Sequence, residues 1–419
     1  MELGRTIKYY RIKHNMTQAE LADGICSIPH LSKIENTIYK ANHATASLLL
    51  ERLGINIEDE YAQQAEIKHS LEAFIEAIQF VDEKEAHAIM VRLLDKESTI
   101  ARTNYINTYH LYMMRYHLMS GKTHLALQDW TIIDKNKSNF SEVEALSARL
   151  FYGIYLVNKG RLKEAKELLF DIQNEDYSSK YMFAREVSFV LAQCYTQLNE
   201  PEKAIIYAKE ALTIFKQEDN YIRAFHSQML LGINYTQLNM VEESTRVYKI
   251  LLRNTRLFGH DSLYYQATFN NGILLKKIGE YERSHQCFKE CISFYEAGSQ
   301  NYVYSLLADV EVLFYMENEQ NQIRMNLDEI LKISVTRGFE KMKLQARYFS
   351  YRLEANDAMY SFIEAELLPH LDKLENKHEP IPYALELAKW YQKNGEHEKA
   401  NEFLSKYVTE TKRRELSIV

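Results

Sequence analysis

The chain has 419 residues, of which 46% are hydrophobic and 26% charged, and it contains 13 glycines and 5 prolines. One hydrophobic core rarely serves a chain of this length, so we expect several domains or a stacked repeat array. So little glycine and proline argues against an all-β or loop-rich fold and favours an all-α one. The net charge of −7 does not exclude a nucleic-acid partner, because residues 1–45 carry six basic and four acidic side chains and DNA affinity depends on the local field.

The four cysteines (Cys26, Cys194, Cys287 and Cys291) have no disulfide-framework spacing, which favours a reducing compartment. Cys287 and Cys291 could form half a metal site, but no histidine or second cysteine pair lies near them. We therefore expect buried apolar cysteines, no metal and no cofactor. The N-terminus lacks an apolar signal segment, and no run of eighteen apolar residues occurs, so we expect a cytoplasmic protein without membrane contact.

The first sixty residues predict several short helices. An amphipathic helix is expected over Leu3–His14, with Leu3, Ile7, Tyr10 and Ile12 on its apolar face. Thr17 with Glu20 forms a capping-box pattern, so a second helix is expected to begin at Gln18.

A third helix is expected after Ser27, which can cap it, while Pro29 is tolerated in its first turn. Two short helices joined by a tight turn place the second helix in a DNA major groove, with its N-terminal residues at the base edges. Those exposed residues would be Ser27, Ile28, His30 and Lys33. The alternative is a small helical bundle used for dimerisation or docking.

The segment TQAELADGICSIPHLSKIEN, from Thr17, resembles the helix-turn-helix of the XRE class. Its length and its Ile25-Cys26 pair resemble the variant found in PlcR-like peptide-pheromone receptors. Two features depart from the class: Thr37 replaces the usual Gly, and Ala41-Asn42 replaces the usual Pro. Both put the shape of the turn after the third helix in doubt.

The resemblance implies binding to double-stranded operator DNA. Gln18 would contact phosphate and support the recognition helix, while Ser27, Ile28, His30 and Lys33 would contact bases or backbone. Ile28 could pack against a thymine methyl group. Further candidates for phosphate contacts, which position the protein without specifying sequence, are Arg5, Arg11 and Lys40.

The rest of the chain contains an internal repeat. Three segments that start at residues 191, 231 and 271 place a small residue every 40 positions. Small or turn-forming residues follow it at +7 and +12. The three sets are Ala192, Asn199 and Ala204; Gly232, Asn239 and Ser244; and Gly272, Gly279 and Ser284. The pattern resembles the tetratricopeptide repeat, whose usual length is about 34 residues.

We therefore expect a right-handed α-solenoid of about nine tetratricopeptide-like helix pairs, several of them with degenerate signatures. The expected division is a helix-turn-helix domain over residues 1–60, a linker helix over 61–70, and a peptide-binding and dimerisation domain over 71–419. Such an array has no catalytic centre, and its concave wall binds peptides or helices.

The inner wall comes from the first helix of each pair. The residues expected there include Gln193, His226, Gln266, Phe269, Asn270 and Lys276. Amide side chains can hold the main chain of an extended peptide, and Asn270 resembles the asparagine that grips the pheromone in PlcR-like receptors. Arg185, Arg223 and Arg347 could receive an acidic group or the peptide carboxylate. Each of the amide residues could also be merely an exposed helix residue.

The whole architecture resembles the NprR- and PlcR-type receptors for re-imported signalling peptides, within the wider superfamily that includes Rap proteins. The resemblance implies a quorum-sensing transcriptional regulator that forms a homodimer or higher oligomer and whose DNA binding changes with peptide. The alternative is a Rap-like module that sequesters a response regulator under peptide control. We expect no enzyme, because the sequence contains no HExxH, no P-loop and no nucleophile-base grouping.

Overall fold

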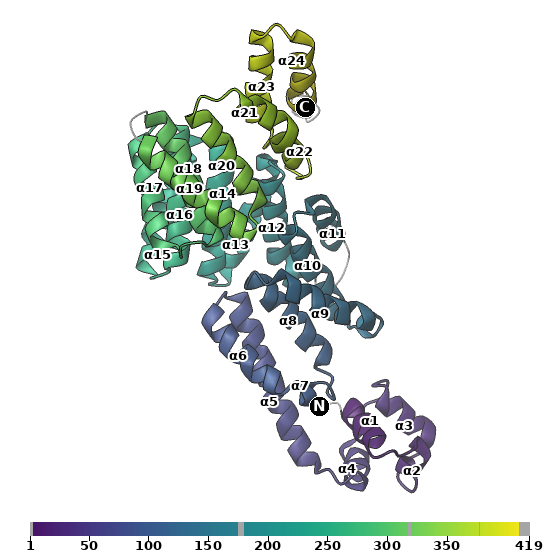
Figure 1. Ribbon diagram of the computed structural model, residues 1–419. Coiled ribbons are helices and arrows are strands. Elements are labelled where there is room, and N and C mark those ends of the chain that lie inside the picture. Colours follow the sequence, from purple (N-terminus) through teal and green to yellow (C-terminus); the bar gives the residue numbers. More distant parts are fainter. Residues whose placement is uncertain (1–2, 175–179, 317–319, 377, 410–419) are drawn as a thin grey trace. The chain divides into compact units, whose positions relative to one another are not determined.

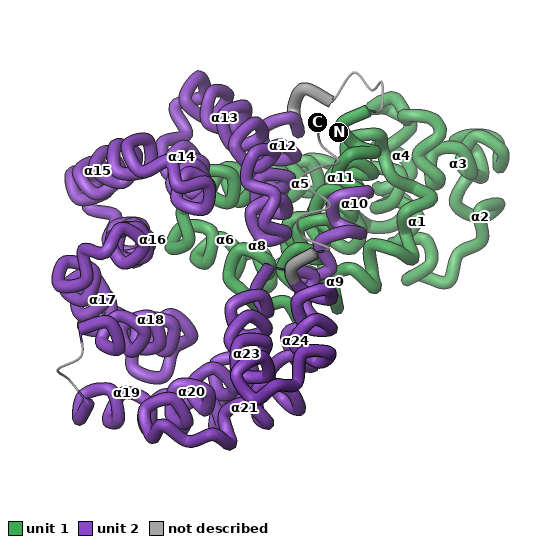
Figure 2. Tube along the Cα trace, turned by 90° about the horizontal axis from the view of Figure 1, so that it is seen from above, with its two compact units in different colours: residues 1–158, 168–180 green, residues 159–167, 181–419 purple. Residues whose placement is uncertain are grey.

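The computed structural model describes residues 3–174, 180–316, 320–376 and 378–409, and all regular elements within these ranges are helical (Figure 1). The all-α prediction is confirmed. Contacts between residues that are close in space divide the chain into two compact units (Figure 2). The first unit comprises residues 1–158 and 168–180, and the second comprises residues 159–167 and 181–419. Within the described ranges, no helix combines the length and apolar character needed to cross a membrane.

The head of the first unit contains helices α1 (Gly4–Lys13), α2 (Gln18–Ala22), α3 (Ile28–Glu35) and α4 (His43–Arg52). The capping box at α2 is confirmed, because the Glu20 amide donates to Thr17 Oγ1 at 3.2 Å and the Thr17 amide donates to Glu20 Oε2 at 2.6 Å. Ser27 caps α3 by accepting a hydrogen bond from the His30 amide. Caps therefore set where both short helices begin.

The apolar face of α1 differs from the prediction at one position. Leu3, Ile7 and Tyr10 are buried in the core of the head, but Ile12 is 56% exposed. Ile12 follows Ile7 by five residues, which places it about 140° around the helix from the buried face.

Helix α5 (Ile57–Gln79) follows the head, and buried polar contacts fasten α1 to it. Tyr10 Oη donates to Glu60 Oε1 at 3.0 Å, and Gln64 Nε2 donates to Thr6 Oγ1 at 3.1 Å. Arg102 donates to the same Glu60 oxygen at 3.2 Å. Burial and then the Glu60 carboxylate raise the pKa of Tyr10 to about 12. The expected linker over residues 61–70 is thus the middle of a continuous helix, and the domain division stays a prediction.

From α5 onward, the described helices follow one another as nine pairs, as expected. The first five pairs are α5 with α6 (Glu83–Asp95), α8 (Ile106–Met119) with α9 (Thr123–Asn136), α10 (Glu142–Asn158) with α11 (Leu162–Asn174), α12 (Lys180–Gln197) with α13 (Pro201–Gln217), and α14 (Tyr221–Gln237) with α15 (Val241–Leu257). The short helices α7 (Glu97–Ile100) and η1 (Lys137–Asn139) lie in connections.

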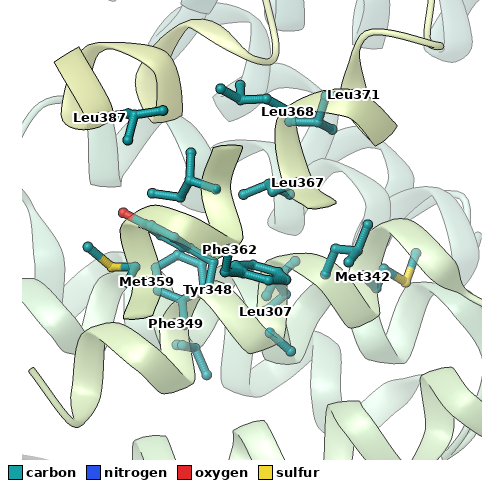
Figure 3. Packing of buried hydrophobic residues seen from close by; sticks show 14 of the residues in the cluster. Leu307, Met342, Tyr348, Phe349, Met359, Phe362, Leu367, Leu368, Leu371 and Leu387 are labelled. Atoms are coloured by element: carbon teal, nitrogen blue, oxygen red, sulfur yellow. The ribbon is translucent and has the colours of Figure 1, made fainter. Parts of the chain in front are cut away.

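The remaining pairs are α16 (Asp261–Lys277) with α17 (Tyr281–Phe294), α18 (Gln300–Met316) with α19 (Gln320–Arg337), α20 (Glu340–Leu353) with α21 (Ala358–Phe362), and α23 (Ile381–Lys393) with α24 (His397–Leu404). A π-helical turn, η2 (Ile363–Leu367), joins α21 to α22 (Leu368–Leu371), and a second one, η3 (Ser405–Thr409), follows α24. Figure 3 shows the buried cluster that holds the last pairs together, with Phe362 and Leu367 near the middle of the view and Leu368 and Leu371 above them.

In two of the 40-residue repeats, the small residue is a glycine that lies against a side chain of the second helix of its pair. A Cβ atom at Gly232 would lie 2.7 Å from Tyr248 Cε1, and one at Gly272 would lie 2.8 Å from Phe288 Cε1. Both rings are fully buried. Glycine therefore makes room for the aromatic ring sixteen residues later.

The residues at +7 and +12 have equally specific roles. At +7 the backbone is left-handed, with φ of 56° at Asn199, 59° at Asn239 and 83° at Gly279, a conformation that Asn and Gly tolerate. At +12, Ser284 Oγ donates to the Gly272 carbonyl at 2.8 Å, and Ser244 makes the same bond to Gly232. The repeat pattern of the sequence is thus a pattern of turns and close contacts.

The substitution Gly232→Ala is expected to destabilise the array by about 1–3 kcal/mol, because the added methyl group overpacks the contact with Tyr248. Chemical denaturation followed by circular dichroism measures the loss. In a Tyr248→Leu background the same substitution should cost less, since the smaller side chain leaves space. An equal cost in both backgrounds would contradict the steric explanation.

Candidate functional sites

The recognition helix α3 presents the residues expected to face DNA. Ser27, Ile28 and Lys33 are exposed, and His30 is half-buried because its ring packs against Tyr39, with centroids 4.8 Å apart. The sequence analysis missed Tyr39, which is 50% exposed beside α3. Because Tyr39 follows the end of the helix, no periodicity could have indicated it.

Arg11 has a different role from the expected phosphate contact. Its guanidinium forms two bonds with Glu35, Nε to Oε1 at 2.6 Å and Nη2 to Oε2 at 2.9 Å, and the Glu35 side chain is fully buried. The hydrogen bonds to Glu35 raise the pKa of Arg11. Gln18 Nε2 donates to the same carboxylate at 2.8 Å. Arg11 is therefore a structural residue that holds α1 to α3, and Gln18 joins α2 to α3 as the resemblance implied.

The turn after α3 forms without the usual glycine. Thr37 adopts a left-handed backbone with φ of 59°, which costs a β-branched residue about 1–2 kcal/mol. Amides of Ile38 and Tyr39 nevertheless both donate to the Lys33 carbonyl, at 2.9 and 3.2 Å. Lys40 is exposed just beyond this turn, and Arg5, on α1, makes no hydrogen bond or ion pair with the described residues. Both stay candidates for phosphate contacts.

A cavity of about 380 Å³ lies between α12, α14, α16 and α18 of the second unit. It brings together five of the predicted ligand-binding residues, namely Gln193, His226, Gln266, Phe269 and Asn270. We call it the amide cavity. Asn301 and Tyr304 of α18 also line it and were missed. The 40-residue period would require a small residue at position 312, where the chain has Val312, so it could not be extended to α18.

The amide cavity is electrically neutral, because none of its lining residues within the described ranges is Asp, Glu, Lys or Arg. Burial, together with the smaller effect of the nearby Arg223 and His260, lowers the pKa of His226 to about 3. His226 is therefore uncharged near pH 7. Asn270 Nδ2 donates to the Gln266 carbonyl of its own helix at 2.9 Å, so its Oδ1 atom is left to accept from a ligand.

Four basic residues expected at the site line no part of this cavity: the three arginines expected to receive a ligand carboxylate, and Lys276, which was expected on the inner wall. Each is paired with a carboxylate of the protein: Arg185 with Glu218 at 2.8 Å, Arg223 with Glu186 at 3.6 Å, Lys276 with Glu311 at 2.6 Å, and Arg347 with Glu366. Arg223 also lies over the Phe189 ring at 5.2 Å. Partly buried cations are stabilised by such pairs, so we withdraw the expectation that these four residues are free to bind the ligand.

All four cysteines are free. Cys194 and Cys291 are buried as predicted, whereas Cys26 and Cys287 are only partly buried. Burial raises the pKa of the Cys291 thiol to about 12, which keeps it protonated. The described residues contain no cluster of His, Cys, Asp or Glu that could hold a metal ion.

Comparisons with known proteins find both a helix-turn-helix and a tetratricopeptide repeat in this chain. Residues 7–59 match the helix-turn-helix family, and residues 186–218 match the tetratricopeptide repeat family. The chain is 23% identical over 396 residues to the transcriptional activator NprA of Geobacillus stearothermophilus, covering 91% of this chain and 97% of NprA.

Two solved structures have a similar fold. One is NprR in complex with its cognate peptide NprX, with a TM-score of 0.66 and 18% identity, covering 81% of this chain and 96% of NprR. The other is a Rap protein complexed with competence and sporulation factor, with a TM-score of 0.71 and 15% identity, covering 83% of this chain and 98% of that chain.

The chain thus combines a helix-turn-helix head with tetratricopeptide repeats, as the sequence analysis predicted. The chain is thus similar over most of its length to the transcriptional activator NprA, and its fold is similar to those of NprR and a Rap protein.

Substitutions of Arg11 and Arg5 should separate folding from DNA contact. Arg11→Ala leaves the buried Glu35 carboxylate without its cation, which costs about 3–5 kcal/mol, so the head should lose its thermal transition and its DNA binding together. Arg5→Ala should keep the transition and weaken binding to a random-sequence duplex, with a salt dependence shallower by about one charge. Differential scanning calorimetry and fluorescence anisotropy measure the two effects. Equal stability of both variants would contradict the role given to Arg11.

The low pKa of His226 makes the stability of the array depend on pH. Unfolded histidine binds a proton below its ordinary pKa of 6.5, whereas folded His226 binds one only near pH 3. Stability that is fully present above pH 6.5 is therefore lost as the pH falls towards 3, by at most about 1.4 kcal/mol per unit. Denaturation between pH 7 and pH 4 should show a shallower loss in His226→Asn than in the unmodified chain. The exposed His397→Asn control should follow the unmodified chain.

Proposed function

We propose that this regulator controls transcription by binding a short linear signalling peptide in the amide cavity. The observation that carries the proposal is the convergence of Gln193, Gln266, Asn270 and Asn301 on one neutral cavity with apolar walls. Amide groups both donate and accept, so they match the main chain of an extended peptide whatever its side chains. The peptide-bound relative NprR supports this proposal.

The same proposal assigns DNA binding to residues 1–60, peptide binding and self-association to residues 71–419, and a linking role to residues 61–70. The DNA contacts would be Ser27, Ile28, His30, Lys33, Lys40, Arg5 and Gln18. A peptide that touches α12, α14, α16 and α18 couples four consecutive helix pairs, and an array passes such a change to its neighbours. In a cytoplasmic homodimer or higher oligomer, this change would alter whether two recognition helices lie about 34 Å apart, one turn of DNA.

The experiment that tests this function measures DNA binding by the full chain with and without peptide. The DNA is the region upstream of the protein's own gene, and the probes are synthetic peptides from the C-terminal end of any short reading frame beside that gene. A peptide-dependent change in footprint or affinity at low salt is expected. Failure to bind this DNA in either state would overturn the proposal.

A second candidate, sequestration of a response regulator, is favoured by the similarity of the fold to a Rap protein. Co-purification with a phosphorelay protein, reversed by added peptide, would support it. The two functions do not exclude each other.

Asn270→Ala should weaken peptide binding about tenfold while leaving the fold and the DNA binding of the peptide-free chain intact. A lost buried hydrogen bond to the peptide costs about 1.4 kcal/mol, which is tenfold in affinity. Isothermal titration calorimetry measures the affinity. Asn401→Ala, on the exposed surface of α24, is the control and should leave affinity unchanged. Unchanged affinity in Asn270→Ala would place the peptide elsewhere.

A further inference from the structure

Helix α15 carries a row of exposed cations that the function proposed above does not use. The helix packs against α14 and α16, and its Tyr248 and Leu251 are buried in the cluster that the three helices share. Both neighbours also line the amide cavity, so α15 lies behind that cavity rather than in its wall. The exposed side of α15 presents four basic residues, which we call the basic stripe: Arg246, Lys249, Arg253 and Arg256.

The basic stripe follows one side of the helix. At 100° per residue its four positions fall within about 80° of one another, roughly opposite Tyr248 and Leu251. The stripe extends for about 15 Å along the helix axis. Residues 244–260 contain no Asp or Glu, and Glu242, on the same side, precedes the stripe by one turn. The exposed side of α15 is therefore positive over about three turns.

Neutral groups, not carboxylates, contact the C-terminal end of the basic stripe. Arg253 Nε donates to Asn254 Oδ1 at 3.2 Å, and Arg256 donates to Tyr264 Oη while its guanidinium lies over the same ring at 4.7 Å. Among the described residues, no carboxylate forms an ion pair with any of the four cations. The positive charge of the stripe therefore faces solvent without a counter-charge from this part of the chain.

The helix dipole explains only part of this charge. It favours cations in the last turn, where Arg256 lies, but Arg246 and Lys249 are too far from the C-terminus to gain from it. The second helices of the neighbouring pairs, α13 and α17, contain acidic and basic residues side by side along their length. An exposed helix of this array thus does not require charge of a single sign, and α15 differs from its neighbours.

Exposed apolar side chains lie at the C-terminal end of the basic stripe. Leu257 is 78% exposed and Phe258 is 57% exposed. The Phe258 ring packs against the buried ring of Phe225, with centroids 5.4 Å apart, and against Tyr221 at 5.7 Å. Phe258 is therefore held in place by the core while part of its surface stays open. Exposed apolar groups beside charge of one sign are typical of an interaction surface.

We propose that the basic stripe docks an acidic amphipathic helix of a partner protein, in addition to the DNA and peptide binding proposed above. An α-helix can present one carboxylate per turn, about every 5.4 Å along one face, which matches cations that recur once per turn. An apolar residue at the end of that face would cover Leu257 and Phe258. Charge complementarity then selects the partner, and the apolar contact adds affinity.

A DNA duplex fits the same surface less well. Its phosphates follow a backbone that winds around the duplex, so a straight stripe crosses this backbone instead of following it. Phosphate contacts also depend on charge alone and leave Leu257 and Phe258 uncovered. A second copy of the chain is the remaining occupant, and the experiment below distinguishes both from a protein helix.

Fluorescence anisotropy of synthetic helical peptides mixed with the full chain tests the proposal. The acidic probe is an alanine-based peptide of about 20 residues, long enough to be helical, with one Glu per turn on one face and a Leu at each end of that face. The control probe has the same composition, but its Glu residues are spread around the helix. The acidic probe should bind about tenfold more tightly, because only aligned carboxylates meet the whole stripe.

Charge reversal locates the binding surface. The double variant Lys249→Glu/Arg253→Glu should weaken binding of the acidic probe about tenfold, since two exposed attractions become repulsions. Lys209→Glu/Lys216→Glu, exposed on α13, is the charge-matched control and should stay within about twofold. A probe with Lys in place of Glu should bind the first double variant more tightly than the unmodified chain. Asn270→Ala should leave the acidic probe unaffected, because the amide cavity takes no part.

Equal binding of the acidic and control probes to the unmodified chain would overturn the inference, as would an equal loss in both double variants. If Lys249→Glu/Arg253→Glu weakens binding to a random-sequence duplex but not to the acidic probe, the stripe contacts nucleic acid instead. If it lowers the sedimentation coefficient of the chain without affecting the probe, the occupant is a second copy. Each of these results leaves the proposed function standing, because that function uses the head and the amide cavity. Thermal melts of the variants confirm that the comparison concerns folded protein.

Discussion

The close approach of paired helices at Gly232 and Gly272 is the constraint on which the array depends. The aromatic rings of Tyr248 and Phe288 occupy the space that a Cβ atom would need, so the two helices of each pair can pack in one register. In the two 40-residue repeats that contain Gly232 and Gly272, the residues that line the amide cavity lie at fixed distances in sequence before the glycine. His226 and Gln266 precede it by six residues, and Met229 and Phe269 by three. These offsets place the cavity-lining stripe about a quarter turn from the packing contact, so the packing of the paired helices also positions the side chains that line the amide cavity.

The packing of successive helix pairs also decides which charged side chains are paired. Cations that the helical register places near the concave wall, such as Arg223 and Lys276, lie beside Glu186 and Glu311 of neighbouring helices and pair with them. Their pairing leaves the amide cavity neutral, and burial keeps His226 uncharged as well. Arg223 and Lys276 therefore link successive helix pairs through these ion pairs and do not add charge to the amide cavity.

The head adds buried polar contacts to its apolar core. The buried carboxylate of Glu35 accepts hydrogen bonds from Arg11 of α1 and from Gln18 of α2. This contact fixes the angle between the two helices of the motif and thereby the surface that α3 presents. A second polar set, centred on Glu60, fastens α1 to α5 and joins the head to the first helix pair. The orientation of the recognition helix is thus determined by two buried carboxylates.

Local and periodic features of this protein were determined by the sequence alone. Capping at Thr17 and Ser27, the left-handed turns at Asn199, Asn239 and Gly279, and the 40-residue spacing of small residues depend on short-range chemistry, so each could be predicted. The tetratricopeptide-like register of the repeats then predicted five residues that line the amide cavity, including Asn270. Only the tertiary structure decided which charges are paired, because Arg11 and Arg223 find carboxylates 24 and 37 positions away in the chain. The tertiary structure alone also placed Asn301 and Tyr304 in the amide cavity. It likewise brought α20 and α23 beside α18, because packing between successive helix pairs follows no local sequence pattern.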